Sequence, residues 1–178
     1  GGIILVLVFL VTSVRLARGT DSSRVLSSQN LKAKGPKEAP VQLIVYSDFQ
    51  CPACKNVRDP AEELRNEFRD VVRVEFRHYP LERPHRWALT AARFAECAAE
   101  QGKFWEYHDR LFLEQETWSA LGDAIPAFAG YVRDLGLDTQ RLTQCLERSE
   151  TLGRIRHEQA IGAKQGVQST PTVFINDR

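Results

Sequence analysis

The position of one Cys-x-x-Cys pair, Cys51 and Cys54, constrains the fold of this chain more than any other feature. The pair follows Val41–Tyr46, an apolar run rich in the β-branched and aromatic residues that favour strands. It is followed by Lys55–Arg69, where apolar residues recur every three or four positions, as they do in a helix. We therefore expect Cys51 where a strand ends and a helix begins, with Pro52 in the first helical turn, where no amide donor is needed.

The expected position of Cys51 favours redox chemistry. The unpaired amides and the positive dipole end of a helix N-terminus stabilise a thiolate by about 0.3–1 kcal/mol, and by up to ~2 kcal/mol when the group is partly buried. A stabilised thiolate is a better leaving group, and the matching disulfide is more oxidising. Cys54 lies one helical turn further along and can close a disulfide with Cys51.

A Cys-x-x-Cys pair can also be half of a zinc site or a structural disulfide. Zinc would need a second such pair or two closely spaced histidines. The other cysteines stand alone, and the histidines are scattered along the chain as His78, His85, His108 and His157. The sequence therefore predicts no metal site.

The composition is that of a globular domain with a tail: 178 residues, of which 43% are apolar and 26% charged, with a net charge of +1. This balance gives no reason to expect nucleic-acid binding. The chain contains no methionine, so we expect a fragment or a processed form.

The N-terminal part contains a strongly hydrophobic run, residues 3–11. The run is shorter than the roughly 20 residues that span a bilayer, but upstream residues could complete it. A membrane anchor and a signal peptide both fit this pattern, and the poor cleavage signal that follows favours an anchor within residues 1–19. Residues 20–39 are rich in Ser, Lys, Gly and Pro and predict a flexible linker.

The folded domain is expected at residues 40–178. Val71–Arg77 alternates apolar and charged residues and predicts a second strand, which with the first strand and the helix makes a parallel βαβ unit. Helical periodicity then fills residues 84–166. An apolar run returns at 167–176 with Pro171 at its start, where a proline is tolerated in a strand and where the X-Pro bond can be cis.

Four stretches in this order, residues 45–54, 76–81, 101–108 and 166–172, resemble the DsbA-like thiol–disulfide oxidoreductases of the thioredoxin superfamily. The resemblance implies an α/β fold with a central sheet, flanking helices and an all-helical insertion. It also implies a final strand pair and helix that are missing from this chain. In that family Pro171 would be the cis-proline beside the redox pair, and Thr170 would line the site.

The resemblance implies an enzyme, a protein disulfide oxidoreductase with no cofactor besides the Cys51–Cys54 disulfide. Cys51 would exchange with cysteine thiols of extracytoplasmic proteins, Cys54 would resolve the mixed disulfide, and Thr170 and Pro171 would bind substrate. The implied location is the bacterial periplasm or cell-envelope exterior, with a tether to the membrane. A quinone-linked membrane thiol oxidase, or a reductant, would be the redox partner.

Two departures from relatives leave the direction of exchange open. Strongly oxidising members often carry a His between the cysteines, where this chain has Pro52-Ala53, and some carry a buried acid where this chain has Val45. We expect an oxidase, with a reductase or isomerase as the alternative. A copper-delivery module that binds metal through both cysteines, and a purely structural domain, are the other hypotheses.

Cys97 and Cys145 lie in the predicted helices. They are either two small buried side chains or a disulfide that joins the helical insertion, and an oxidising compartment favours the disulfide. The aromatic residues around Trp105 and His108 predict core packing, with these two partly exposed. His78 and His85 are expected to have capping or surface roles.

Overall fold

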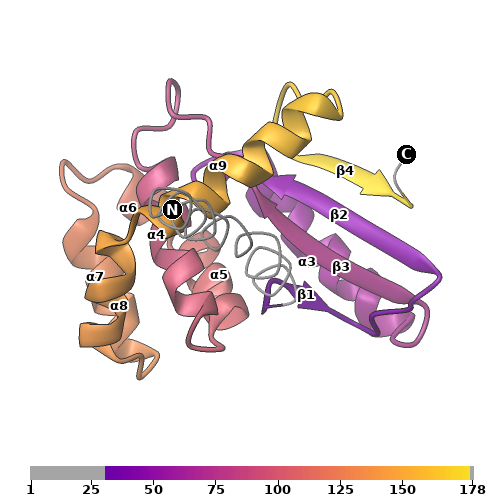
Figure 1. The fold of residues 1–178 in the computed structure, drawn as a ribbon, viewed down its shortest axis with the longest axis horizontal. Coiled ribbons are helices and arrows are strands. Elements are labelled where there is room, and N and C mark those ends of the chain that lie inside the picture. Colours follow the sequence, from indigo (N-terminus) through magenta and orange to yellow (C-terminus); the bar gives the residue numbers. More distant parts are fainter. Residues whose placement is uncertain (1–30, 177–178) are drawn as a thin grey trace, which may run out of the picture.

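The computed structural model describes residues 31–176, and within them a four-stranded sheet is combined with seven helices (Figure 1). The sheet has the order β1-β3-β2-β4. Its central strands β2 (Val41–Ser47) and β3 (Val72–His78) are parallel, with Val41 opposite Val72 and Ser47 opposite His78. β4 (Thr172–Ile175) pairs antiparallel with β2, and the short β1 (Ala33–Lys34) pairs antiparallel with β3. The parallel βαβ unit predicted from the sequence is present.

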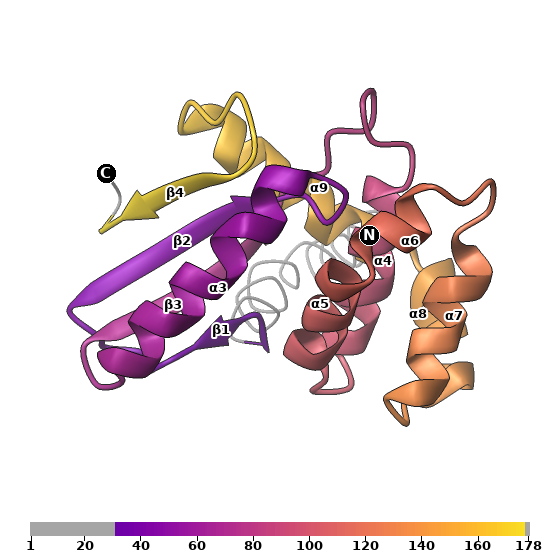
Figure 2. The ribbon, with the colours of Figure 1, turned by 180° about the vertical axis from the view of Figure 1, so that it is seen from behind.

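Helices cover both faces of the sheet. α3 (Pro52–Glu67) connects β2 to β3 and lies on the face that is nearer in Figure 2, while α9 (Ser149–Lys164) crosses the opposite face. α9 approaches closely at Gly162, because a Cβ atom there would lie 2.7 Å from Cε1 of Tyr46. A glycine at this position lets the helix backbone rest directly on a ring of the central strand.

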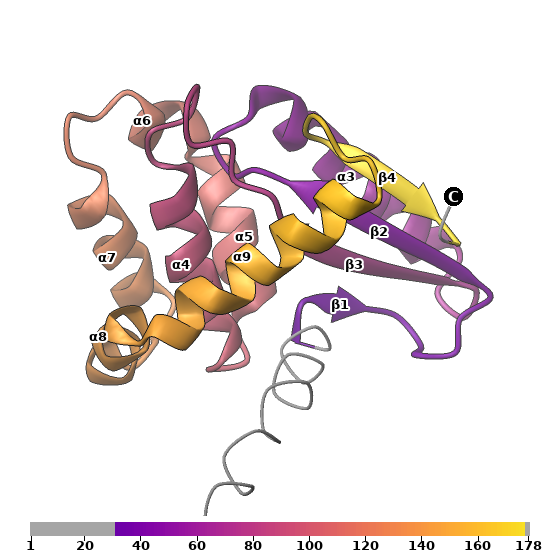
Figure 3. The same cartoon turned by 45° about the horizontal axis from the view of Figure 1, so that its top comes forward.

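The other helices form a separate layer beside the end of the sheet (Figures 1 and 3). Their bounds are α4 (Ala88–Ala99), α5 (Phe104–Leu113), α6 (Gln115–Ser119), α7 (Ile125–Asp134) and α8 (Thr139–Glu147). α4 is rich in buried alanines, and it contacts α5, α7, α8 and α9. Small side chains let several helices approach it, so α4 forms the centre of the helical layer.

The main hydrophobic core is shared by the sheet and the helices. It joins Phe49 and Phe76 to Phe104 and Phe112 of α5, and the two rings Phe49 and Phe76 stack at 5.0 Å. Cys54 belongs to the same cluster. The helical layer therefore does not fold as an appendage, because it completes the core beneath the Cys-x-x-Cys pair.

A buried network of charges also ties the layers together. The Lys32 side chain is fully buried, and its Nζ lies 2.7 Å from Glu96 Oε2 of α4 and 2.6 Å from Glu158 Oε1 of α9. Glu158 also accepts the amide of His78 at 2.6 Å, and Arg154 Nε donates to Glu96 at 2.6 Å. Burial alone would raise the pKa of Glu96, but the Lys32 ammonium and the hydrogen-bonded His78 together outweigh burial and hold that pKa well below its usual range.

The predicted thioredoxin-like fold, a central sheet with flanking helices and a helical insertion, is confirmed. The flexible linker predicted for residues 20–39 is wrong in its second half, because β1 joins the sheet and Lys32 is buried there. Polar composition suggested a tether, but a lysine between two buried carboxylates is a core residue. The anchor predicted within residues 1–19 lies outside the described residues, and no helix among residues 31–176 is long and apolar enough to cross a bilayer.

Candidate active site

Cys51 occupies the junction that the sequence predicted for it. It is the N-cap residue of α3, with extended backbone angles, and Pro52 begins the helix. Pro52 and Ala53 are exposed in the first turn, whereas Cys51 is 7% exposed. The amides of Cys54 and Lys55 turn back toward the Cys51 carbonyl, at 3.1 and 3.4 Å. Cys51 thus lies at the N-terminal, positive end of a sixteen-residue helix, a position that in general favours a thiolate.

Cys54 lies one turn along the same helix in a very different environment. It is 2% exposed, and its sulfur accepts the backbone amide of Asp48 at 3.4 Å. Burial raises the pKa of the Cys54 thiol to about 12, although the Asp48 amide and the Ser47 and Thr170 side chains favour the thiolate. Both cysteines are free thiols in this structure. The pair therefore combines an outer cysteine that lies beside the exposed Pro52 and Ala53 with an inner cysteine whose thiol stays protonated at neutral pH.

The loop before β4 completes the site. The Thr170–Pro171 peptide bond is cis, and the Thr170 carbonyl oxygen accepts the Cys51 thiol at 3.4 Å. Thr170 and Pro171 are both half-buried. The structure thus brings Cys51 and Cys54 together with Thr170 and Pro171, a second pair of residues about 120 positions further along the chain.

The buried carboxylate of Asp48 organises the loop that carries the cysteines. Its Oδ1 accepts the Gln50 amide at 2.7 Å, and its Oδ2 accepts the Leu81 amide at 2.8 Å. His85 Nδ1 lies 2.7 Å from the same Oδ2. Sequence reasoning gave His85 a surface or capping role and assigned no role to Asp48. An acid three residues before Cys51, just after the predicted strand, is the sequence signal that could have pointed to this position.

The helical layer contacts the cysteine loop directly through Gln115 of α6. Its Nε2 donates to the carbonyl oxygens of Phe49 at 2.7 Å and of Cys51 at 3.0 Å, and the side chain is buried. Nothing in the sequence pattern distinguishes Gln115 from a surface glutamine. Its role comes entirely from the packing of α6 against the active-site loop.

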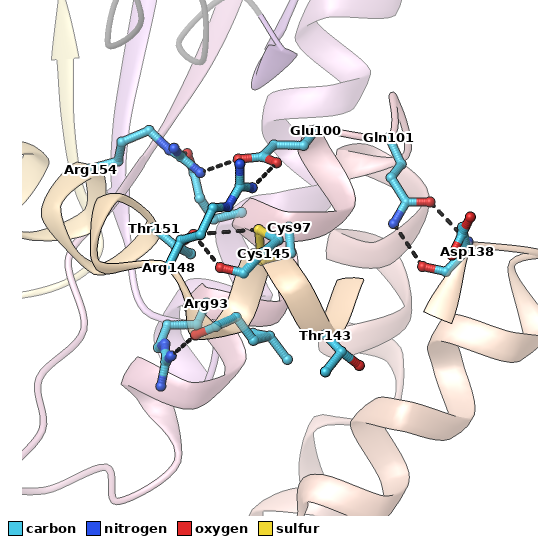
Figure 4. Close-up of a disulfide and its surroundings, with 12 residues drawn as sticks. Arg93, Cys97, Glu100, Gln101, Asp138, Thr143, Cys145, Arg148, Thr151 and Arg154 are labelled. Carbon is cyan, nitrogen blue, oxygen red and sulfur yellow. Dashed lines mark hydrogen bonds and ion pairs between the residues drawn. A yellow bond between two sulfur atoms is a disulfide. The ribbon is translucent and has the colours of Figure 1, made fainter. Parts of the chain in front are cut away.

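Cys97 and Cys145 form a disulfide far from the active pair in sequence. The bond joins α4 to α8, with a Cα–Cα distance of 5.7 Å (Figure 4). Both residues are buried, and Thr151 Oγ1 donates to the Cys145 carbonyl at 2.6 Å. Around them, Arg154 and Arg148 both bind the carboxylate of Glu100. This disulfide lies within the helical layer, so Cys51 and Cys54 are the two cysteines that can pair with each other.

The remaining predicted positions are placed as follows. Val45, which stands where some relatives have a buried acid, is buried in β2. Trp105 is half-buried as expected, but the expected partial exposure of His108 is wrong, because its ring is enclosed by aromatic side chains. His78 is fully buried beside Glu96, not at the surface. Within residues 31–176 no group of three or more His, Cys, Asp or Glu side chains is arranged to hold a metal ion.

Comparison with known proteins gives one family-model match. The model Thioredoxin_4, described as thioredoxin, matches residues 28–178. Among curated proteins, the chain is 38% identical over 146 residues to Na(+)/H(+) antiporter NhaA 3 of Salinispora tropica, a match that covers 82% of this chain and 21% of that protein. The chain thus spans about a fifth of the length of this relative.

Solved structures resemble the chain over most of its length. A thioredoxin-like oxidoreductase from Silicibacter pomeroyi DSS-3 is 26% identical with a TM-score of 0.69, covering 82% of this chain and 80% of that one. DsbA2 of Pseudomonas aeruginosa is 27% identical with a TM-score of 0.67, covering 82% and 79%. The likeness therefore extends over the sheet and the helical layer together.

Proposed function

Because the chain belongs to the Thioredoxin_4 family of thioredoxin domains, we propose that it is a thiol–disulfide oxidoreductase of the DsbA type. The proposed reaction is the exchange of the Cys51–Cys54 disulfide with cysteine thiols of substrate proteins, chiefly to form disulfides in them. No cofactor besides that disulfide is required by the proposal.

The observation that carries this proposal is the asymmetry between the two sulfurs. Cys51 caps a helix N-terminus beside the exposed Pro52 and Ala53 and is 7% exposed, whereas Cys54 is 2% exposed and burial raises its pKa to about 12. In thiol exchange the thiolate is the nucleophile, and the more stable thiolate is the better leaving group. The outer sulfur is therefore suited to exchange with a partner protein, and the inner one to closing or opening the internal bond.

The oxidative half of the proposed cycle takes two steps. A substrate thiolate attacks Cys51 Sγ of the oxidised protein, the internal S–S bond breaks, and Cys54 leaves with the bonding pair and gains a proton. A second substrate thiolate then attacks the substrate sulfur of the mixed disulfide and releases Cys51 as a thiolate. The substrate loses two electrons and two protons and gains a disulfide, while the enzyme becomes a dithiol.

The loop at Thr170 and Pro171 is proposed to hold the substrate. A half-buried segment that precedes β4 and approaches the Cys51 sulfur can pair with an extended peptide through backbone hydrogen bonds. Recognition of main-chain atoms fits a protein that exchanges disulfides with substrates of different sequence.

The oxidase direction rests on the helix N-terminus at Cys51, which favours the reduced form of the enzyme and so makes its disulfide more oxidising. The Pro52-Ala53 dipeptide supplies no further hydrogen-bonding side chain between the cysteines. A reductase or isomerase remains the alternative that the test below separates. Oxidation of the spent enzyme would fall to a membrane thiol oxidase coupled to quinones.

We also propose an extracytoplasmic location. The Cys97–Cys145 disulfide supports it, because structural disulfides persist in oxidising compartments. The proposed membrane tether rests on the sequence of residues 3–11 alone. Extraction of membranes at alkaline pH tests the tether, since a protein held only by surface charge would be released.

The test is the reduction potential of the Cys51–Cys54 pair in the purified protein, equilibrated in graded glutathione buffers and read by thiol trapping and mass. A potential near about −120 mV, that of strong oxidants, supports the oxidase, and one near about −270 mV, that of thioredoxin, supports a reductase. The Cys97–Cys145 bond is an internal control and should stay oxidised throughout. Absence of any exchange at Cys51 would overturn the proposal.

A further inference from the structure

The buried thiol of Cys54 poses a chemical requirement that the rest of the site does not meet. To resolve a mixed disulfide at Cys51, Cys54 must attack as a thiolate, and burial holds its pKa at about 12. At neutral pH such a thiol is almost wholly protonated. If the chain is the oxidoreductase proposed above, on which this inference rests, a base must remove that proton.

A cavity of about 40 Å³ lies against Cys54, and residues of the sheet, α3 and α5 line it. A water molecule requires roughly 10–15 Å³ of such space and two or more polar partners. The cavity has both, since its lining includes Ser47, Lys34 and His108. Water inside it can therefore carry a proton between Cys54 and a polar group on the wall.

His108 of α5 lies on that wall, in contact with the rings of Phe49, Phe76 and Phe112. Its Nδ1 lies 2.8 Å from Oδ1 of Asp109. Burial would raise the pKa of Asp109, but its hydrogen bond with His108 and the nearby cations outweigh burial and lower it. An ionised Asp109 can only accept a hydrogen bond, so Nδ1 carries the proton and Nε2 carries the free lone pair.

The charges around the His108 ring keep it neutral. Burial lowers its pKa, and Lys34 of β1 and Arg58 of α3 lower it further, against the raising effect of Asp109. A neutral imidazole at physiological pH is ready to accept a proton. Among the described residues within this cavity wall, the carboxylates are weaker bases.

Besides Asp109, Glu62 is the other acid that lines the cavity, and it too is a weaker base than the imidazole. Burial would raise its pKa, but Arg65 and Lys34 bind it and lower the pKa instead. Val45, which also lines the cavity, offers no polar atom. Among the titratable side chains that line the cavity, the imidazole of His108 is thus the best-suited acceptor for the Cys54 proton.

We propose that His108 is the general base that takes the proton of Cys54, through water in this cavity, when Cys54 resolves a mixed disulfide at Cys51. The proton passes to Nε2, Cys54 Sγ forms the S–S bond with Cys51 Sγ, and the partner's sulfur leaves with the bonding pair as a thiolate. The imidazolium then releases its proton to solvent. In the opposite direction, when a substrate thiolate attacks Cys51, the departing Cys54 takes a proton from the cavity water, and His108 takes up a proton from solvent and passes it to that water.

The test is the rate of the resolving step as a function of pH. The reduced protein reacts with one equivalent of dithiobis(nitrobenzoate), which attaches thionitrobenzoate to Cys51, and Cys54 then displaces it, seen as a second phase of absorbance. The variant His108→Phe keeps an aromatic ring in the cluster and removes the base. We expect its second phase to be roughly a hundredfold slower near neutral pH, and to rise in proportion to hydroxide between about pH 6 and pH 10.

Two comparisons make the result specific. Trp105→Phe alters the packing of the same wall without removing a base, and should leave the pH profile unchanged. Asp109→Asn leaves the His108 ring in place but removes the carboxylate that holds the ring proton on Nδ1. It should slow the second phase severalfold. This second variant also tests the inference if His108→Phe does not fold.

The outcomes separate this inference from the proposed function. If the wild type shows no second phase, the proposed exchange itself fails. If the wild type resolves normally and both variants keep its pH profile, the role of His108 is overturned while the exchange function stands. A uniform slowing at every pH would indicate packing damage and would equally overturn the role as a base.

Discussion

The two cysteine pairs of this chain can both form disulfides, but they lie in different surroundings. Cys97 and Cys145 are both buried, on two helices, and are joined. Cys51 caps one helix and Cys54 lies in its first turn, with the Cys51 thiol donating to the Thr170 carbonyl beside the exposed Pro52 and Ala53, and Cys54 buried more deeply. Cys97 and Cys145 are enclosed by helices on both sides, whereas Cys51 lies next to the exposed Pro52 and Ala53 at a helix N-terminus. Placement, not the residue type, distinguishes a structural bond from a reactive one.

The largest expected effect comes from Cys51→Ser, which should abolish thiol exchange with any protein substrate, because Cys51 carries the accessible sulfur. The measurement is oxidation of a reduced dithiol peptide followed by mass. Cys54→Ser is the matched variant, and it should instead accumulate a stable mixed disulfide at Cys51. Residual turnover in Cys51→Ser at wild-type rate would contradict the assignment of roles.

Lys32→Met should destabilise the protein by about 3–5 kcal/mol, because it leaves the carboxylates of Glu96 and Glu158 buried without their cation. The free energy of unfolding in urea measures this. Lys103→Met removes an exposed ion pair with Glu106 and should change stability by about 0–1 kcal/mol. Equal effects of the two variants would show that the buried network does not hold the layers together.

Removing the helical disulfide with Cys97→Ala and Cys145→Ala should lower stability by about 4 kcal/mol in the chain-entropy model, since the two cysteines are 48 residues apart. The exchange rate at Cys51, measured where the variant is folded, should stay near that of the wild type. A large loss of exchange in the folded variant would mean that the two pairs are coupled, contrary to the comparison drawn above.

Gln115→Ala should cost about 1–3 kcal/mol, because the buried Phe49 carbonyl loses the donor that the structure gives it. It should also loosen the cysteine loop and raise the alkylation rate of Cys54. Gln101→Ala is the matched control, since Gln101 makes two hydrogen bonds with Asp138 at the surface (Figure 4) and should change stability by less than about 0.5 kcal/mol. Similar effects of both changes would assign Gln115 no special role.

The sequence by itself was sufficient for the local features of the site. An apolar run, a Cys-x-x-Cys pair, a proline and a helical period determine that Cys51 caps α3, because these depend on residues within a few positions of one another. The position of Pro171 before a strand is equally local, and the thioredoxin-like fold followed from four motifs in order.

Only the tertiary structure decided which distant groups surround these cysteines. The burial of Lys32, the hydrogen bonds of Gln115 and the pairing of His85 with Asp48 join segments separated by more than 35 positions. Lysine and glutamine are mostly surface residues and histidine is found both outside and inside, so residue type alone predicted the wrong places for Lys32 and His78. The same holds for His108, whose neighbours on β1 and α3 come together only when the chain folds. Local patterns specify where a sulfur sits on its helix, while its proton chemistry depends on packing between distant elements.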